Sequence, residues 1–143
     1  MSIEEKQNFQ TFQDSNFLIE RPQNEREASN FIKKFYKSDL PIEIVGLGSK
    51  KGIGKSLQCS KTLSFEKLNE IIEYFPEELY IKVGSGTPIK TIEEELKKNN
   101  QQLAFEPIDF GYLFYGKSNS GSAGGQVSCN ISGPRRFKVG SIR

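Results

Sequence analysis

Residues 118–136 read Ser-Asn-Ser-Gly-Ser-Ala-Gly-Gly-Gln-Val-Ser-Cys-Asn-Ile-Ser-Gly-Pro-Arg-Arg, and this stretch does most to decide the fold. Its adjacent glycines, Gly124 and Gly125, permit backbone conformations or a close approach of a ligand that a Cβ would block. The small residues after them would let a flat ring system lie against the main chain. Arg135 and Arg136 follow a Gly-Pro turn and offer two cationic forks. A Gly/Ser linker is the alternative interpretation, but linkers rarely contain a run such as Asn-Ile-Ser-Gly-Pro-Arg-Arg.

A second glycine-rich stretch, residues 46–56, follows an apolar run at 42–45 that predicts a buried strand. Its Gly-Lys-Ser end is similar to the P-loop pattern GxxxxGK[ST]. The spacing does not fit, because Ser49 stands where the first glycine is required and extended chain rather than a helix follows. Two interpretations remain for this stretch. Its backbone N–H groups can form a concave anion site to which Lys50 adds charge, or it is a flexible connecting loop.

Composition excludes several classes of function. The chain has 143 residues, which suit a single domain. Its net charge of +2 argues against binding of nucleic acid or of an anionic membrane surface. It contains no histidine, which removes Ser-His and Cys-His nucleophile pairs, histidine-ligated metals and histidyl-linked cofactors. Cys59 and Cys129 lie in no CxxC pattern, so we expect reduced, packed side chains rather than a disulfide or a metal site.

The order of predicted elements indicates an α+β domain with an α/β-like N-terminal half and a partly parallel sheet. Helices are expected after caps at Asn24, Ser64 and Thr87, the last with Pro88 in its first turn. The first is expected to end at Asp39 with a buried stripe, and the second to have apolar residues on one face; these are Ala28, Phe31, Ile32 and Phe35 for the first and Phe65, Leu68, Ile71 and Ile72 for the second. The expected strands lie at 42–45, 57–63, 80–83 and 103–105, with a glycine turn at 84–86. Beyond Pro107 the composition shifts to Gly and Ser, with almost no helix signal. Residues 1–19 are expected to be a tail or a frayed helix. No run reaches the ~20 apolar residues of a membrane span, and no signal peptide is evident, so a soluble intracellular protein is expected.

The ordered series of these runs resembles the FAD-binding domain of the vanillyl-alcohol-oxidase/PCMH flavoprotein superfamily. More narrowly, it is similar to the FAD-binding subunits of bacterial glycolate oxidases. The resemblance covers residues 20–143, and its runs lie at 46–50, 74–79, 83–88, 92–96, 103–107, 124–125, 132–136 and 140–143. It implies a PCMH-type FAD-binding domain that is incomplete at its C-terminus, with the first subdomain and part of the second. Sheet strands would then be left as open edges, and we expect marginal stability.

The resemblance also nominates site residues by position. For the FAD diphosphate these are Gly46, Leu47, Gly48, Ser49 and Lys50. For the flavin and ribityl region they are Pro107, Ser122, Gly124, Gly125, Val127, Ser128 and Asn130. Non-covalent FAD is expected, because the chain lacks histidine and Cys129 replaces a small residue of the family. Arg135 and Arg136 can bind a substrate carboxylate or a flavin phosphate, or can form a structural ion pair. No residue is identified as a catalytic base, and no metal is expected.

The function that the resemblance implies is FAD-dependent oxidation of glycolate, or of a related 2-hydroxy acid, to the 2-oxo acid. The implied partners are a second flavoprotein subunit and an iron-sulfur subunit, and the implied location is the cytoplasm or the inner-membrane periphery, reached through those partners. Three alternatives stay open. The chain is a non-catalytic FAD-binding, structural or electron-relay subunit, it serves an FAD-linked oxidase of another alcohol, or it is an unrelated nucleotide binder that uses residues 46–56.

Overall fold

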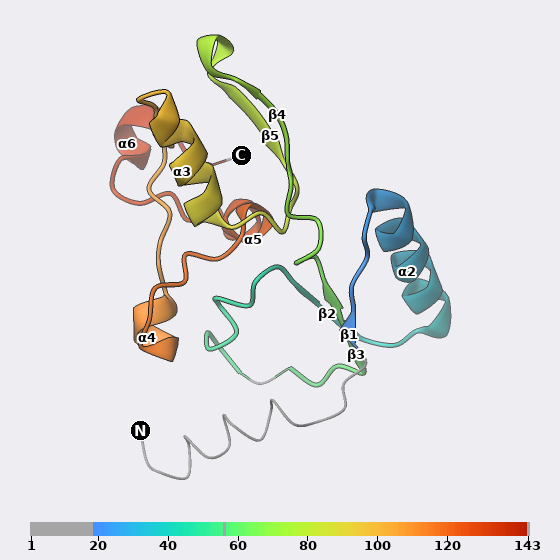
Figure 1. Cartoon of the computed structure of the whole chain (residues 1–143). Coiled ribbons are helices and arrows are strands. Elements are labelled where there is room, and N and C mark those ends of the chain that lie inside the picture. The colour runs from blue at the N-terminus through green and yellow to red at the C-terminus, as the bar shows by residue number, and fades with distance from the viewer. Residues whose placement is uncertain (1–18, 56, 143) are drawn as a thin grey trace.

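The computed structural model describes residues 19–55 and 57–142. Helices and strands are mixed along the chain, and Figure 1 shows α2 at one end of the molecule and α3 and α6 toward the other. In chain order the elements are β1 (Ile19–Glu20), α2 (Glu25–Ser38), β2 (Ile42–Val45), β3 (Lys61–Ser64), β4 (Ile71–Phe75), the 3-10 turn η1 (Pro76–Glu78), β5 (Tyr80–Val83), α3 (Ile89–Lys98), α4 (Gly111–Tyr115), α5 (Ala123–Cys129) and α6 (Arg136–Val139). The α+β class is therefore confirmed. The expected tail at 1–18 lies outside the described residues, and Ile19 already belongs to a strand.

A parallel sheet of three strands forms the N-terminal half, in the order β1-β3-β2. The central strand β3 is the most buried, and its Leu63 is fully enclosed. Ile44 of β2 lies opposite Leu63 in the register. The predicted strand at 42–45 is confirmed, whereas the strand predicted at 57–63 begins only at Lys61. The parallel direction of β1 and β2 follows from the helical crossover that α2 makes between them.

Helix α2 begins and ends where its sequence predicts. The side chain of Asn24 accepts a hydrogen bond from the N–H of Glu27 (2.9 Å), and the Glu27 carboxylate accepts one from the N–H of Gln23 (2.8 Å). This capping satisfies one N–H group of the first turn, that of Glu27, and the N–H of Gln23, which precedes the helix. Phe35 is buried on the side of α2 that faces the sheet, where the Lys61 ammonium lies 5.4 Å from its ring centroid. Ile32, expected in the same buried stripe, is 43% exposed.

The segment after β3 is not the helix that its apolar spacing predicts. Residues 71–75 form β4, which pairs antiparallel with β5. The Ser64 hydroxyl does accept from the N–H of Glu66 (3.4 Å), as an N-cap would. The following carbonyls are used elsewhere, because Leu68 O accepts from Gly86 N–H and Glu70 O accepts from Gly84 N–H, both at 2.8 Å. Long-range bonds to the 84–86 turn therefore replace the helix.

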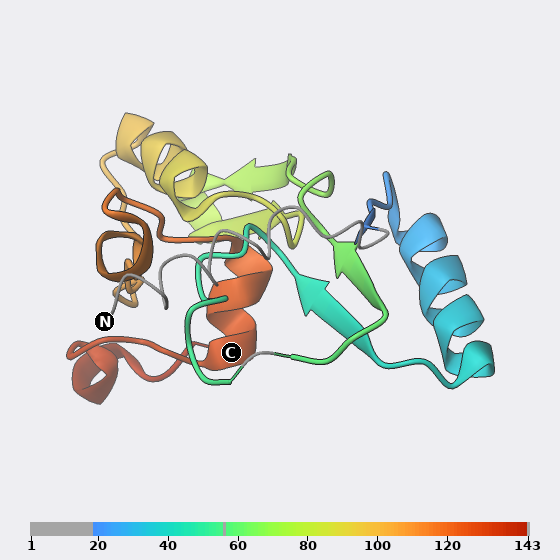
Figure 2. The same cartoon turned by 90° about the horizontal axis from the view of Figure 1, so that it is seen from below.

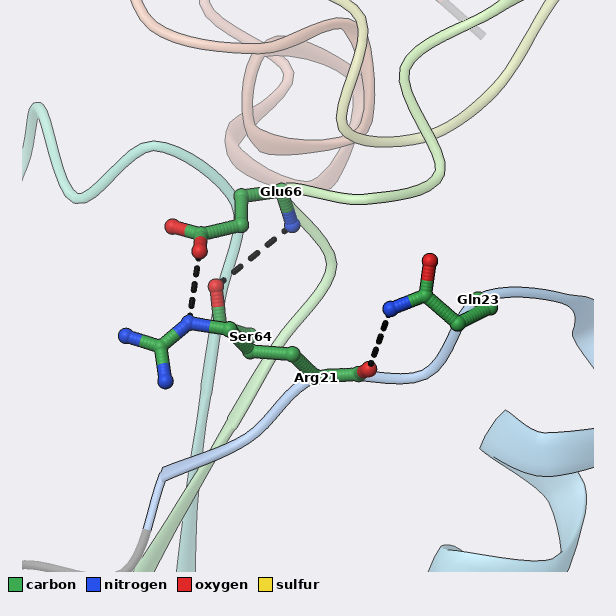
Figure 3. A network of polar contacts seen from close by, with 4 residues as sticks. All are labelled: Arg21, Gln23, Ser64 and Glu66. Carbon is green, nitrogen blue, oxygen red and sulfur yellow. Dashed lines mark hydrogen bonds and ion pairs between the residues drawn. The ribbon is translucent and has the colours of Figure 1, made fainter.

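An ion pair joins the segment after β3 to the chain after β1. Arg21 Nε lies 2.6 Å from Glu66 Oε1, and Figure 3 shows the same glutamate bonded to Ser64 through its main chain. Gln23 donates to the carbonyl of Arg21 in the same network (3.5 Å). Both members of the ion pair are substantially exposed, so the pair fixes geometry more than it adds stability.

Helix α3 packs on the β4–β5 hairpin and forms the hydrophobic core of the C-terminal half. Ile89, Ile92 and Leu96 are buried there. The partly buried side chains around them are Tyr74, Ile81, Val83, Leu103 and Ala123. The helix lies where the sequence predicts, but its cap does not, because Pro88 occupies the N-cap position. The Thr87 hydroxyl instead donates to the carbonyl of Glu70 (3.2 Å), which ties the helix start to the hairpin.

The last third of the chain differs most from expectation. The strand predicted at 103–105 is absent from the described residues, and three short helices, α4, α5 and α6, occupy the region that carried almost no helix signal. The sequence of α5 in particular does not indicate a helix, because its glycine and serine residues have low helix propensity. Its stability comes from its ends. The Ser122 side chain accepts from the N–H of Gly125, and Asn130 closes the helix in the left-handed conformation.

Candidate functional site

The two glycine-rich stretches lie in contact, although about 70 residues of sequence separate their centres. Figure 2 shows the loop after β2 running beside α5. A Cβ on Gly46 would overlap the Ser122 hydroxyl, and a Cβ on Gly121 would overlap that of Ser49. Glycine is therefore required at both contacts. We call residues 46–50 the first glycine loop, and we call residues 121–125, which include the first residues of α5, the second glycine loop.

Two buried hydroxyl groups line the contact between these loops. Ser49 is 5% exposed and Ser122 is 2% exposed. Ser122 caps α5 through its bond from Gly125 N–H (3.3 Å). The second loop is anchored to the segment before α3, because Ala123 N–H donates to Thr87 O (2.9 Å) and Gly124 N–H donates to Ser85 O (2.8 Å). The residues that precede α3 thus hold the second glycine loop in position beside the first.

Lys50 is the cation that faces the second loop. Its Nζ lies 5.9 Å from the ring centroid of Phe110, and 3.7 Å from the place where a Cβ on Gly121 would lie. Burial lowers the pKa of Lys50, and the nearby thiol of Cys129 acts in the opposite, weaker sense. No carboxylate forms an ion pair with Lys50 within the part of the chain that the structure describes. The neighbouring Lys51 differs, since its Nζ lies 3.0 Å from Glu43 Oε2.

Residues 109–120 form a further segment of the site that the sequence did not indicate. The Tyr115 hydroxyl donates to the carbonyl of Gly48 (2.9 Å), inside the first glycine loop. The Phe114 ring occupies the space beside Gly52, where a Cβ would come within 2.8 Å of its Cγ. The run of four aromatic residues between 110 and 115 was the available signal. The spacing of these aromatic residues fits neither an amphipathic helix nor a strand clearly.

One carboxylate holds this segment together. Asp109 accepts hydrogen bonds from Gly111 N–H (2.7 Å), Ser118 Oγ (2.6 Å) and Asn119 N–H (2.8 Å). Partial burial acts to raise the pKa of Asp109, but the hydrogen bonds, led by that from Ser118, together hold it below its ordinary value. The ionised form of Asp109 is therefore stabilised by the fold.

Gln126 is a second residue of the site that sequence reasoning missed. It is fully buried, and its Nε2 donates to Ile108 O (3.0 Å) and to Ser120 O (2.6 Å). Its Oε1 has no hydrogen-bond partner in the structure. These bonds tie the chain beside Pro107 to α5. Gln126 thus links the two parts of the nominated flavin-region set.

The structure divides the nominated flavin-region residues into two groups. Ser122, Gly124 and Gly125 lie at the enclosed start of α5, beside Lys50. The others at its far end are exposed to solvent, namely Val127, Ser128 and Asn130. Pro107 is partly buried next to Ile108. In the first glycine loop Leu47 is exposed, and the other four residues are buried or partly buried.

The roles of the two arginines separate. Arg135 forms an ion pair with Glu106 (Nε to Oε1, 3.1 Å), and its N–H donates to the same carboxylate (2.9 Å). The structural interpretation is therefore confirmed for Arg135, whereas Arg136 is exposed at the start of α6. Both cysteines are free, but Cys129 is exposed on α5, so the expectation of a packed side chain was wrong for it.

The chemistry of the enclosed part of the site suits an anion that carries phosphate groups. It offers one ammonium group without a carboxylate partner among the described residues, two serine hydroxyls and main-chain N–H groups, with no side-chain bulk from the glycines. Among those residues no group of three or more His, Cys, Asp and Glu side chains is placed to hold a metal ion. Nor does any described helix combine the length and the apolar character of a membrane span.

Comparison with known proteins places the chain in a family. Residues 18–143 match the model of a family described as an FAD binding domain. Among curated proteins, glycolate oxidase subunit GlcE of Escherichia coli (strain K12) is 36% identical over 112 residues, which are 78% of this chain and 30% of GlcE. The chain thus spans less than a third of the length of that relative.

Solved structures support the same fold. Alkyldihydroxyacetonephosphate synthase superposes with a TM-score of 0.66 at 20% identity, over 87% of this chain and 24% of the synthase. p-Cresol methylhydroxylase superposes with a TM-score of 0.52 at 21% identity, over 62% of this chain and 18% of the hydroxylase. At these identities the likeness concerns the fold, which is the PCMH-type architecture that the sequence runs predict.

Proposed function

This chain belongs to the FAD-binding domain family, and on that premise we propose that it is the FAD-binding part of a flavin-dependent 2-hydroxy-acid oxidase subunit. FAD is the cofactor of the family, and the donor groups of the site fit it. Lys50 supplies a half-buried positive charge, and the glycine loops leave room for a dinucleotide to approach main chain. The observation that carries the choice of substrate class is the 36% identity to a glycolate oxidase subunit.

We assign the FAD diphosphate to the first glycine loop, residues 46–50. The buried hydroxyl of Ser49 and the ammonium of Lys50 are the side chains that support this assignment. We assign the ribityl and flavin region to the second glycine loop and α5, with Pro107 at its border. Ser128 and Asn130 then contact the cofactor from the exposed end of α5. When bound, the flavin would accept a hydride from the α-carbon of a 2-hydroxy acid. The residues of this chain bind and orient the cofactor.

Non-covalent binding is part of this proposal. The chain has no histidine, and its two cysteines are free. The proposed substrate is glycolate or a related 2-hydroxy acid, and the proposed partners are a second flavoprotein subunit and an iron-sulfur subunit. The proposed location is the cytoplasm, with contact to the inner membrane through these partners.

A second candidate function keeps the cofactor but not the catalysis. In this case the chain supports a complex as an FAD-binding, structural or electron-relay subunit. One observation favours it, because the ion pair with Glu106 removes Arg135 from the groups available to a substrate carboxylate. An FAD-linked oxidase of another alcohol is compatible with the same site.

The absorption spectrum of the purified protein tests the cofactor proposal. We expect a flavin spectrum after addition of FAD and release of the chromophore when the protein is unfolded. A flavin that stays on the denatured chain would contradict non-covalent binding and point to Cys59 or Cys129. Failure to bind FAD under conditions where the protein is folded would contradict the proposed role.

Glycolate-dependent dye reduction by the assembled complex separates the two candidate functions. Gly125→Trp places an indole at the enclosed start of α5 and is expected to abolish dye reduction while the complex still assembles. Ile72→Trp, at a position of β4 that is 50% exposed and outside the proposed site, is the comparison for general effects of the bulky side chain. Unchanged activity in Gly125→Trp would favour the structural role.

A further inference from the structure

One carbonyl group of the first glycine loop, that of Gly48, accepts two hydrogen bonds. Gly48 has φ +68°, and its carbonyl accepts from Lys51 N–H (3.2 Å) and from the Tyr115 hydroxyl (2.9 Å). A carbonyl oxygen has two lone pairs, so both are occupied by these donors. The oxygen that would repel a phosphate is thereby held on the protein side of the loop. The Lys51 bond closes the turn, and the Tyr115 bond ties the turn to a different part of the chain.

Tyr115 is itself held in place. It ends α4, and the preceding Phe114 packs beside Gly52. Asp109 closes the segment by binding both Gly111 and Asn119, which lie on either side of Tyr115. The segment 109–120 is thus a loop closed by Asp109, and it contacts residues 48–52 through Phe110, Phe114 and Tyr115. No other element supplies a side-chain hydrogen bond to the Gly48 carbonyl within the described ranges.

We propose that Tyr115 is a positioning residue for the diphosphate of FAD. It acts through Gly48 and does not touch the cofactor. Its hydroxyl keeps the first glycine loop in the conformation that presents Ser49 and Lys50 to an anion. This inference rests on the proposed function, because it takes the diphosphate as the ligand of that loop.

Tyr115→Phe tests the inference, because it removes one hydroxyl and keeps the ring. Tyr112→Phe is the matched control, since Tyr112 lies on the same helix and is 70% exposed. Loss of one hydrogen bond between uncharged groups predicts that the Kd for FAD rises about threefold to tenfold in Tyr115→Phe. The Kd for ADP, which carries a diphosphate without a flavin, is expected to rise by a similar factor. Tyr112→Phe is expected to match the wild type for both ligands.

Two further measurements separate positioning from a general loss of structure. Hydrogen exchange at the Lys51 amide of the ligand-free protein is expected to quicken in Tyr115→Phe, whereas the thermal midpoint changes little. The phosphorus NMR signals of bound FAD are expected to differ between Tyr115→Phe and wild type. Unchanged FAD and ADP affinities in Tyr115→Phe, with tight binding by the wild type, would overturn the inference alone. A folded wild-type protein that binds neither ligand would overturn the proposed function and this inference with it.

Discussion

At the scale of single residues, Lys50 and Lys51 are adjacent in sequence but differ in their surroundings. Lys51 forms an ion pair with Glu43, whereas Lys50 lies half-buried between the glycine loops. A hydrogen bond to a charged group contributes about 1.5–3 kcal/mol, so we predict that Lys50→Met raises the Kd for FAD about tenfold or more. Lys51→Met is the matched control, with an expected change below about threefold. Fluorescence titration at low and moderate salt measures both values. Equal effects of the two substitutions would contradict the assignment of Lys50.

Gly46 makes a second prediction at this scale. A methyl group at Gly46 would overlap the buried Ser122 hydroxyl, so Gly46→Ala forces the two glycine loops apart. We expect a loss of about 1–3 kcal/mol in the free energy of unfolding, together with weaker FAD binding. Gly125→Ala is the comparison, because its Cβ would lie 3.3 Å from the same hydroxyl and alanine favours a helix. Urea denaturation should show a change of less than about 1 kcal/mol for Gly125→Ala. A stable Gly46→Ala protein would show that the loops are not packed as described.

The same residues indicate how far sequence reasoning reaches into the site. Ser49, Lys50 and Gly125 were nominated because they lie in runs with a recognisable order. Tyr115 and Gln126 were not, because their roles come from contacts with residues 67 and 18 positions away. A hydrogen bond across such a separation leaves no local pattern.

At the scale of elements, local signals and long-range bonds compete. Helix α2 was predicted closely, because its cap at Asn24 and its left-handed end at Asp39 are formed by neighbouring residues. The segment 64–75 has an equally good helical spacing of apolar residues and still forms a turn and a strand. Its carbonyls at 68 and 70 bind the 84–86 turn, so the pairing of β4 with β5 outweighs helix propensity. The short α5 was missed for the opposite reason, since its caps stabilise a sequence of poor propensity.

The Asp109 clip gives a pH-dependent prediction at the element scale. The folded state lowers the pKa of Asp109, so the carboxylate stabilises the protein above the unfolded pKa of about 4 and this contribution is lost as pH falls through the folded value. We expect Asp109→Asn to lower the free energy of unfolding by about 1 kcal/mol at pH 7. The difference in the free energy of unfolding between the variant and the wild type should become smaller as the pH is lowered from 5 to about 3. Glu93→Gln, at an exposed position of α3, is the control and should show no such convergence. A gap that stays constant with pH would contradict the role of the Asp109 charge.

At the scale of the whole molecule, the stability of the core and the geometry of the site are coupled. The core formed by α3 and the β4–β5 hairpin is small. The start of α3 is hydrogen-bonded to the second glycine loop, because Ile89 N–H donates to Gly121 O (3.0 Å) and Ala123 N–H donates to Thr87 O (2.9 Å). The first glycine loop directly follows β2 of the parallel sheet, so the sheet fixes where the loop begins. The proposed FAD site therefore forms only when these two parts of the fold are packed together. Binding of FAD should stabilise both, because a ligand of the native state shifts unfolding to higher temperature.

Ile92→Ala tests this coupling. Ile92 is 3% exposed at the centre of the core, and truncation of a buried isoleucine to alanine costs about 2–5 kcal/mol. We predict a loss in this range for the ligand-free protein, measured by urea denaturation, and a recovery of thermal stability when FAD is added in excess. Ile32→Ala on α2 is the matched control, since its side chain is 43% exposed and a loss below about 1 kcal/mol is expected. If excess FAD stabilised Ile32→Ala but did not raise the thermal midpoint of a folded Ile92→Ala protein, the predicted recovery would be contradicted. If FAD stabilised neither variant nor the wild type, the packed loops would not be its binding site.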